Sequence, residues 1–363
     1  MSSQQPSAVR GIHLRRLEEN ADEVAALHAL TDGRTSLDAV TATGSAGQAR
    51  QVSWVPGLRV GGGFTWEAAD NRTRTWWPQG ITSTADAGRA DHNLLVTSWY
   101  AREDDGLRRG ARLSVVDLTS LRYRHVLLVR PVLTDGELDL EPVRVHAGGI
   151  VWAGPYLHVA GTARGLVSCR VGDAVRIPDD LWDPDPRRLG RTPAGRLASF
   201  GHRHVLPVRF GYTAHHEEGV ERMRYSFLSL ERSEPHPHLV AGEYGRGEMT
   251  TRLARFSLDP NSFHLQPGED DLSRPLLLEE GGMAGMQGVV VVGDTWYVTA
   301  SRGPWGPGSL YVGRPGAFRE HRWALPMGPE DITWWPATDH LWSLSEHPSR
   351  RWVFWLDRSG FDR

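Results

Sequence analysis

Four short segments of similar sequence begin with, or closely follow, a polar side chain that could take part in catalysis. They are Gln79-Gly80-Ile81-Thr82, Gly148-Gly149-Ile150-Val151, Gln287-Gly288-Val289-Val290 and Glu330-Asp331-Ile332-Thr333. Alignment puts Gln79, Gly148, Gln287 and Glu330 in equivalent positions, and His146 lies two residues before Gly148. An imidazole and a carboxylate exchange protons readily, and amides orient a substrate or a developing oxyanion. The segments therefore predict acid–base chemistry, provided that the fold brings them together.

Within this set, His146 is the candidate acid or base, and Glu330 is its partner or a metal ligand. Further candidate substrate-binding residues are Gln79, Gln287, Trp77, Tyr225 and Trp334. No cofactor is certain, although imidazole, carboxylate and amide oxygen ligands suit a divalent cation, so a metal site at His146 and Glu330 is possible. The alternative is that these polar groups line a water-filled channel and serve only the structure.

The same segments begin a repeating pattern of predicted strands. Second strands are predicted at 94–100, 157–162, 296–301 and 341–347, third strands at 112–118, 165–171, 308–313 and 351–357, and a weaker copy at 225–230, 239–244 and 252–259. Repeated sheet-forming units over several tens of residues are typical of a radial array, most simply a β-propeller. In such an array the first strand of each unit lines a central channel, which would bring the candidate residues to one mouth.

Fourth strands and ring closure complete the predicted fold. Fourth strands are expected at 125–130, 204–210, 276–279 and 320–325, and the first two share the pattern His-Val-Leu-x-Val-Arg. Pro207 in the second one indicates an outermost edge strand. The last copy ends at Asp357 with six residues left, so a strand from 50–68 is expected to close the ring. The sequence predicts an all-β, five-bladed propeller of four-stranded blades over residues 50–363.

Residues 1–49 are expected to form a disordered lead and one short helix. Asn20 can cap a helix over 20–32 in which Val24, Leu27 and Leu30 follow at helical spacing, and Gly33 can end it. The largest insertion, 177–198, is rich in Asp, Pro and Arg, and is either a functional lid or a tolerated loop.

Composition excludes several classes of function. The net charge of −3 argues against nucleic acid or an anionic membrane as a partner. The chain lacks lysine, which excludes Schiff-base catalysis, and its single cysteine, Cys169, excludes an internal disulfide. No apolar segment near the N-terminus or elsewhere suits a signal peptide or a membrane span, so a cytoplasmic protein with a small-molecule substrate is expected. The 15 tryptophans are expected mainly to pack between sheets.

The repeat resembles the five-bladed β-propeller architecture over about residues 50–357. Four sequence segments look like those of largely uncharacterised propeller proteins from actinobacteria. They are Trp77-Pro78-Gln79-Gly80-Ile81, His146-Ala147-Gly148-Gly149-Ile150, Met286-Gln287-Gly288-Val289 and Pro329-Glu330-Asp331-Ile332. The chemistry also resembles that of propeller lyases for macrocyclic antibiotics, which implies elimination promoted by an axial histidine, a glutamate and a metal. Five-bladed propellers also include glycosidases with three axial carboxylates and sugar-binding lectins.

These observations lead to one principal prediction of function and two alternatives. The principal prediction is a small-molecule enzyme of specialised metabolism, a non-redox acid–base lyase or cyclase whose pocket is the channel mouth. The first alternative is a propeller that binds sugar or protein without catalysis. The second is a glycoside hydrolase, which needs two carboxylates across the channel. Besides Glu330, the ends of second strands offer Glu243 and Glu346, which are interpreted as turn or interblade residues.

Overall fold

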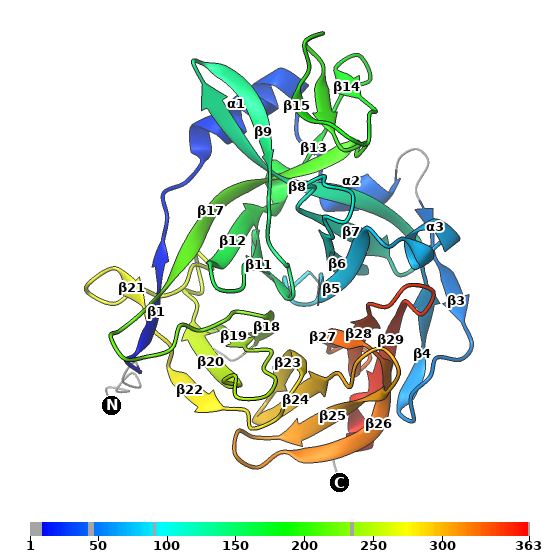
Figure 1. Ribbon diagram of the computed structural model, residues 1–363, viewed down its shortest axis with the longest axis vertical. Helices are drawn as coiled ribbons and strands as arrows, with labels where there is room; N and C mark the ends of the chain where they lie inside the picture. Colours follow the sequence, from blue (N-terminus) through cyan, green and yellow to red (C-terminus); the bar gives the residue numbers. More distant parts are fainter. Residues whose placement is uncertain (1–8, 43–46, 90–91, 233–235, 362–363) are drawn as a thin grey trace.

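The computed structural model describes residues 9–42, 47–89, 92–232 and 236–361, and they form an all-β fold (Figure 1). The few helices are α1 (Ala21–Thr31), α2 (Leu37–Ala42) and α3 (Ala68–Arg72), with short 3₁₀ turns at Val171–Asp173 and Arg358–Phe361. The all-β prediction is confirmed. The prediction of a single short helix is wrong, because α2 and α3 form as well.

The described strands include five antiparallel units of four strands. The first two units are β5 (Trp76–Ser83), β6 (Leu94–Ala101), β7 (Ala111–Asp117) and β8 (Arg122–Thr134), then β10 (Ile150–Ala153), β11 (Tyr156–Ala160), β12 (Gly165–Arg170) and β17 (His204–His216). The next two are β18 (Phe227–Glu231), β19 (His238–Gly242), β20 (Arg252–Ser257) and β22 (Leu277–Glu280), then β23 (Met286–Val292), β24 (Thr295–Ala300), β25 (Pro307–Gly313) and β26 (Arg319–Met327). The last is β27 (Pro329–Trp335), β28 (His340–Ser345), β29 (Trp352–Asp357) and β4 (Val60–Thr65), with β3 (Arg50–Val52) outside it.

The first strands of the units contact one another in the cyclic order β5, β10, β18, β23, β27 and back to β5. Figure 1 shows β5, β18, β23 and β27 around the centre of the molecule. The ring is closed by an early strand, as expected, because β4 pairs antiparallel with β29. Residues far apart in the chain therefore reach one central region, which is the condition that the predicted site required.

Glycines in the repeated segments permit this close approach of the first strands. A Cβ added to Gly149 would lie 2.1 Å from the Leu228 nitrogen, and one added to Gly288 would lie 2.5 Å from the Asp331 Cα. No side chain fits at such distances, so the glycine of the repeat is explained by packing. In the fifth unit Asp331 takes the glycine position, and its carboxyl accepts hydrogen bonds from the backbone nitrogens of Ile81 at 3.3 Å and Ile150 at 3.4 Å.

The outer strands of the first two units differ from the prediction. Strands β8 and β17 pair in parallel, with Pro207 opposite Val129, so Pro207 is not on a free outermost edge. The pairing joins both units into one larger sheet. Five short strands extend this sheet. Strands β1 (Ile12–Arg16) and β13 (Val175–Arg176) pair with β17, and β21 (Leu272–Ser273) pairs with β1. Strands β2 (Gly47–Gln48) and β9 (Glu137–Pro142) pair with β8.

The insertion at 177–198 is ordered as a small sheet of its own. It consists of β14 (Trp182–Asp183), β15 (Leu189–Arg191) and β16 (Leu197–Ser199). The buried core lies between neighbouring sheets, and Trp99, Trp152 and Trp296 are buried there as expected. Other tryptophans do not follow that prediction, since Trp54 and Trp305 are exposed.

Candidate functional site

Three first strands carry a register irregularity at the same place, next to the predicted polar residues. In β5 the pairing with β6 shifts between Pro78 and Ile81, which flank Gln79. Corresponding shifts occur in β23 at Gln287 and in β27 around Glu330. A β-bulge interrupts strict alternation and re-aims the side chains that it carries. The bulges explain how consecutive polar residues leave the sheet at this edge.

Two carboxyl groups gather here, and each is held by a glutamine amide. The Gln287 Nε2 donates a hydrogen bond to Glu330 Oε1 at 3.1 Å. The Gln79 Nε2 donates to Glu346 Oε2 at 3.0 Å. Glu346 directly follows β28, whose Ser345 pairs with Pro329 beside Glu330. We call Gln79, Gln287, Glu330 and Glu346 the carboxyl-pair site.

Electrostatics favour retention of a proton within the carboxyl pair. Burial raises the pKa of Glu330 well above its ordinary value, and the nearby charges of Glu346 and Asp331 raise it further. Burial also raises the pKa of Glu346 to about 7, against the opposing effect of the Gln79 hydrogen bond and the Arg351 charge. Two interacting carboxyl groups lose their protons in separate steps. Both carboxyl groups of the pair therefore keep their protons to a higher pH than exposed glutamates do.

Tyr100 connects the carboxyl pair with His146. Burial raises the pKa of the Tyr100 hydroxyl to about 12, and the charges of Glu346 and Glu330 add to the effect. The Tyr100 ring lies 4.2 Å from the His146 ring, measured between centroids. Both residues line a hollow of about 590 Å³ that also includes Arg102. His146 is exposed to solvent at this hollow. Its imidazole is nevertheless partly surrounded by protein, and this burial lowers its pKa.

The other predicted site residues are distributed unequally. Trp77 lies near the carboxyl-pair site, since its ring is 6.0 Å from that of His347, the residue after Glu346. Trp334 lies four residues beyond Glu330 on β27, which places it about 13 Å along the strand at about 3.3 Å per residue. Tyr225 is fully buried in the core. The structure thus groups Gln79, Gln287, Glu330 and Trp77, with His146 next to Tyr100, whereas Trp334 and Tyr225 lie elsewhere.

Sequence reasoning underestimated Glu346 and missed Tyr100 and Arg351. Arg351 is fully buried and donates from Nε to the Glu346 carbonyl at 2.7 Å, which fixes the backbone beneath the carboxyl. The position of Glu346 at the end of a second strand could have indicated that it lies near Glu330. In an antiparallel pair the end of the second strand lies beside the start of the first strand, where Glu330 is located.

Two other buried acids serve the structure. Asp331 links three first strands through its carboxyl, and burial raises its pKa well above the ordinary value. Glu243 accepts hydrogen bonds from the Arg252 guanidinium at 2.9 Å and from the Arg224 backbone nitrogen at 2.9 Å. These hydrogen bonds outweigh burial and lower the pKa of Glu243. Neither carboxyl is available to a substrate.

The described residues do not provide a cluster suited to a metal ion. No group of three or more His, Cys, Asp and Glu side chains is placed to hold one within the described ranges. The Glu330 carboxyl accepts its hydrogen bond from Gln287, whereas the His146 ring packs against Tyr100. The possible cation site at His146 and Glu330 therefore lacks the ligand set that it would need.

No family model matches this chain, and no curated protein matches it. Among solved structures, a gluconolactonase from Xanthomonas campestris is similar, with 14% sequence identity, a TM-score of 0.32, and coverage of 87% of this chain and 89% of that chain. A GH43_1 enzyme from Xanthomonas citri has 10% identity and a TM-score of 0.35, with coverage of 80% and 90%.

A third similar structure is CoXyl43, a GH43 β-xylosidase/α-arabinofuranosidase from a compost microbial metagenome, with 10% identity, a TM-score of 0.35, and coverage of 84% and 95%. Likeness at this level assigns no activity to the chain. Separately, none of the helices in the described part of the chain has the length and apolar character needed to cross a membrane. The case for a function rests on the geometry of the carboxyl-pair site.

Proposed function

We propose that this chain is a five-bladed β-propeller that hydrolyses a glycosidic bond, with Glu330 and Glu346 as its acid–base pair. The observation that carries the proposal is the pair of neighbouring carboxyl groups with raised pKa values, each oriented by a glutamine amide. Glycoside hydrolysis requires two carboxyl groups. One donates a proton to the leaving oxygen, and the other either accepts a proton from the attacking water or acts as the nucleophile. The five four-stranded units and the cyclic contacts of their first strands support the number of blades.

The pKa values divide the work between the two carboxyl groups. Glu330 is the more deeply buried of the two and its pKa is raised well above the ordinary value, so we assign it as the general acid that protonates the leaving oxygen as the bond to the anomeric carbon breaks. Glu346, with a pKa of about 7, is the base that takes a proton from the attacking water. One water is consumed, and the products are a free sugar and an alcohol. A second step then returns the proton from Glu346 to Glu330 through solvent.

The surrounding residues suit a polar substrate with several hydroxyl groups. Tyr100, Arg102 and His146 line the adjoining hollow and offer hydrogen-bond donors and acceptors. Trp77 offers an aromatic face near the pair, on which the apolar side of a sugar ring can stack. In this mechanism His146 positions substrate and is not the principal base.

A lyase or cyclase that uses His146 and Glu330 as a directly coupled pair has less support. Glu330 is held by Gln287, and its charge is linked to that of Glu346. The His146 ring contacts the ring of Tyr100. The partner of the axial glutamate is therefore a second carboxyl group, which favours hydrolysis over elimination by an imidazole.

The test is a panel of 4-nitrophenyl glycosides of pentoses and hexoses in both anomeric forms, with nitrophenol release as the readout. With the best substrate, Glu330→Gln and Glu346→Gln are each expected to lower kcat by a factor of about 10² to 10⁴, the usual value of a general acid or base. Glutamine keeps the size of the side chain and can still accept the amide hydrogen bond. The wild-type rate should also decline as the pH falls below about 7, because Glu346 becomes protonated.

Glu103→Gln is the matched control, since Glu103 is exposed at the rim of the same hollow. It should turn over substrate at nearly the wild-type rate. Absence of turnover above that of the Glu330→Gln/Glu346→Gln double variant, across the whole panel, would refute hydrolysis. If glycans then bind equally well to wild type and double variant, the binding alternative is correct instead.

A further inference from the structure

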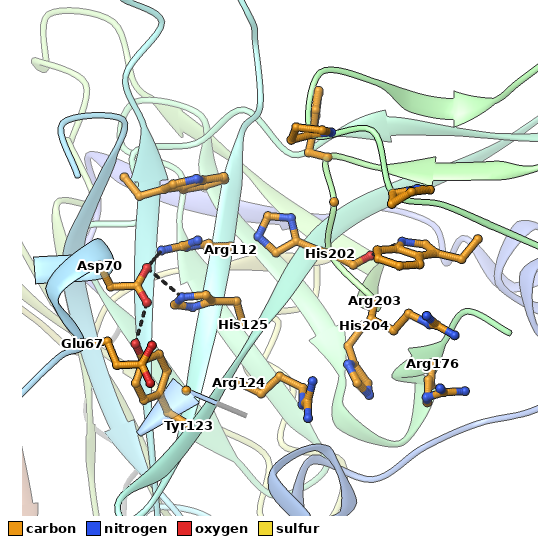
Figure 2. A pocket seen from close by; sticks show the side chains of 17 residues that line it. Glu67, Asp70, Arg112, Tyr123, Arg124, His125, Arg176, His202, Arg203 and His204 are labelled. Carbon is orange, nitrogen blue, oxygen red and sulfur yellow. Dashed lines mark hydrogen bonds and ion pairs between the residues drawn. The ribbon is translucent and has the colours of Figure 1, made fainter. Parts of the chain in front are cut away.

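A second hollow, of about 780 Å³, lies away from the carboxyl-pair site, between β7, β8 and the start of β17, and is covered by the 177–203 segment. Figure 2 shows Glu67 and Asp70 on one side of it and Arg176, Arg203 and His204 on the other. We call it the outer pocket. Nothing in the proposed hydrolysis uses these residues.

The two copies of the pattern His-Val-Leu-x-Val-Arg lie next to the outer pocket. They begin at His125 on β8 and at His204 on β17. β8 and β17 pair in parallel with Val205 opposite Leu127, so the two copies lie side by side with an offset of one residue. This offset alone would place the two histidines on opposite faces of the sheet. Both histidines nevertheless line the outer pocket.

Positive charge is concentrated around His204. Arg124, Arg176 and Arg203 line the outer pocket together with His204. Burial and the charges of these three arginines together lower the pKa of His204 to about 4. Only 2% of His204 is exposed, and its Nδ1 is buried with no hydrogen-bond partner among the described residues. The unpartnered Nδ1 atom of His204 is therefore able to accept or donate a further hydrogen bond.

The acidic side of the outer pocket is already neutralised. Asp70 receives hydrogen bonds from Arg112 at 2.9 Å and from the Tyr123 hydroxyl at 2.5 Å, and His125 lies 3.0 Å away. Burial alone would raise the pKa of Asp70, but these partners hold it well below its usual range. The opposite side has a weaker counter-charge, since Asp179 is 78% exposed and contacts Arg203 and, at 3.6 Å, Arg176.

The walls beside the arginines are aromatic. Trp182 lies under the Arg203 guanidinium, 4.5 Å from it, and Phe200 and Trp76 complete the lining. A flat apolar group can stack on such walls while an attached anion reaches the guanidinium groups.

A nucleophilic triad can be excluded at this position. The Ser114 hydroxyl lies 2.8 Å from His125 Nδ1, and His125 lies beside Asp70, in the order that a triad requires. Ser114 is fully buried within the sheet, however, and its side chain does not line the outer pocket. The geometry suits binding and not acyl transfer.

We propose that the outer pocket binds a small molecule that carries a phosphate-type dianion attached to a flat ring. The dianion lies among Arg124, Arg176, Arg203 and His204 and displaces Asp179, and the ring packs against Trp182 and Phe200. Arginine suits this role because its planar fork matches the oxygens of a phosphate. The His204 Nδ1 gains a hydrogen-bond partner, which accounts for its present lack of one.

Calorimetric titration of the full chain at low ionic strength tests the proposal, with phenyl phosphate, inorganic phosphate and neutral benzamide as the probes. Phenyl phosphate is expected to bind more tightly than inorganic phosphate, and benzamide should not bind. Arg176→Gln and Arg203→Gln should each weaken phenyl phosphate binding about tenfold, as expected for loss of one charged hydrogen bond. Asp179→Asn should strengthen binding, because it removes the competing carboxylate.

Arg188→Gln is the matched control, since Arg188 is exposed and forms an ion pair with Asp185. It should bind phenyl phosphate as the wild type does. If Arg203→Gln does not fold, Arg176→Gln decides alone, because Arg176 is half exposed and forms an ion pair with the exposed Asp179. Absence of binding at millimolar phenyl phosphate, or equal affinity in wild type and the arginine variants, would overturn the proposal.

NMR titration of His204 gives a readout at the site itself. The dianion favours the charged imidazole, so phenyl phosphate should raise the pH at which His204 titrates from the low value that its surroundings now impose. No change in that pH at saturating phenyl phosphate would place the ligand elsewhere and contradict the proposal.

Discussion

Replacement of Glu346 by glutamine should stabilise the protein, and more so as the pH rises. Glu346 is 19% exposed, so solvent does little to relieve the cost of its charge. The folded state holds its pKa at about 7, against an ordinary value of 4.5. A difference of about 2.5 between the two pKa values corresponds to about 3 kcal/mol, since each pKa unit is worth about 1.4 kcal/mol.

The sign follows from proton binding. Between pH 4.5 and 7 the folded state keeps the Glu346 proton while the unfolded chain releases it, so the free energy of unfolding falls as the pH rises through this range. Glu346→Gln removes that loss and retains a carbonyl oxygen for the Gln79 amide. The variant should exceed the wild type by about 1 kcal/mol or less at pH 5 and by about 3 kcal/mol at pH 8.

Urea unfolding at both pH values, followed by tryptophan fluorescence, measures these differences. Glu248→Gln is the control, since Glu248 is exposed in a turn and should show no such dependence on pH. A gap between Glu346→Gln and the wild type that widens by less than about 1 kcal/mol would show that Glu346 is not held in an unfavourable charged state, and the acid–base assignment would lose its basis.

Substitutions at Gly288, Asp331 and Arg351 are further tests, each measured by urea unfolding. Gly288→Ala should cost about 3 kcal/mol or more, because its Cβ would lie 2.5 Å from the Asp331 Cα, whereas Gly172→Ala, with nothing within 4 Å, should cost little. Asp331→Asn keeps an acceptor for two backbone nitrogens and should stay within about 1 kcal/mol of wild type, while Asp331→Ala should cost about 2–4 kcal/mol. Arg351→Met should cost about 3 kcal/mol or more, because it leaves two buried carbonyl groups without their donor. Equal costs within either matched pair, or a negligible cost for Arg351→Met, would contradict these assignments.

The strand pattern could be predicted from the sequence because it depends on local alternation and turns. Predicted strands at 276–279 and 320–325 correspond to β22 and β26, and the strand expected within 50–68 is β4. The parallel pairing of β8 with β17 could not be predicted in this way. It joins residues near 127 to residues near 205, and no short-range signal specifies such a contact.

The site was predicted in part for a similar reason. Gln79, Gln287 and Glu330 share a place in the repeat, so alignment alone identified them. Glu346 has no counterpart among the first strands, and its importance depends on a register that pairs Ser345 with Pro329. Tyr225 aligned approximately with the same set, yet it is buried in the core, because alignment does not determine the direction of a side chain.

Arg351 shows that the carboxyl-pair site and the outer pocket are not electrostatically independent. Its guanidinium donates to the carbonyl groups of Glu346 at 2.7 Å and of Asp70 at 2.6 Å. Burial lowers the pKa of Arg351 to about 10, the charge of Arg112 acts in the same direction, and the charges of Glu346 and Asp70 oppose it. A buried cation between two acids stabilises the ionised form of each, and its influence is strong because little water screens it. The pKa of Glu346 is thus a compromise between burial, which raises it, and this cation, which the outer pocket helps to hold in place.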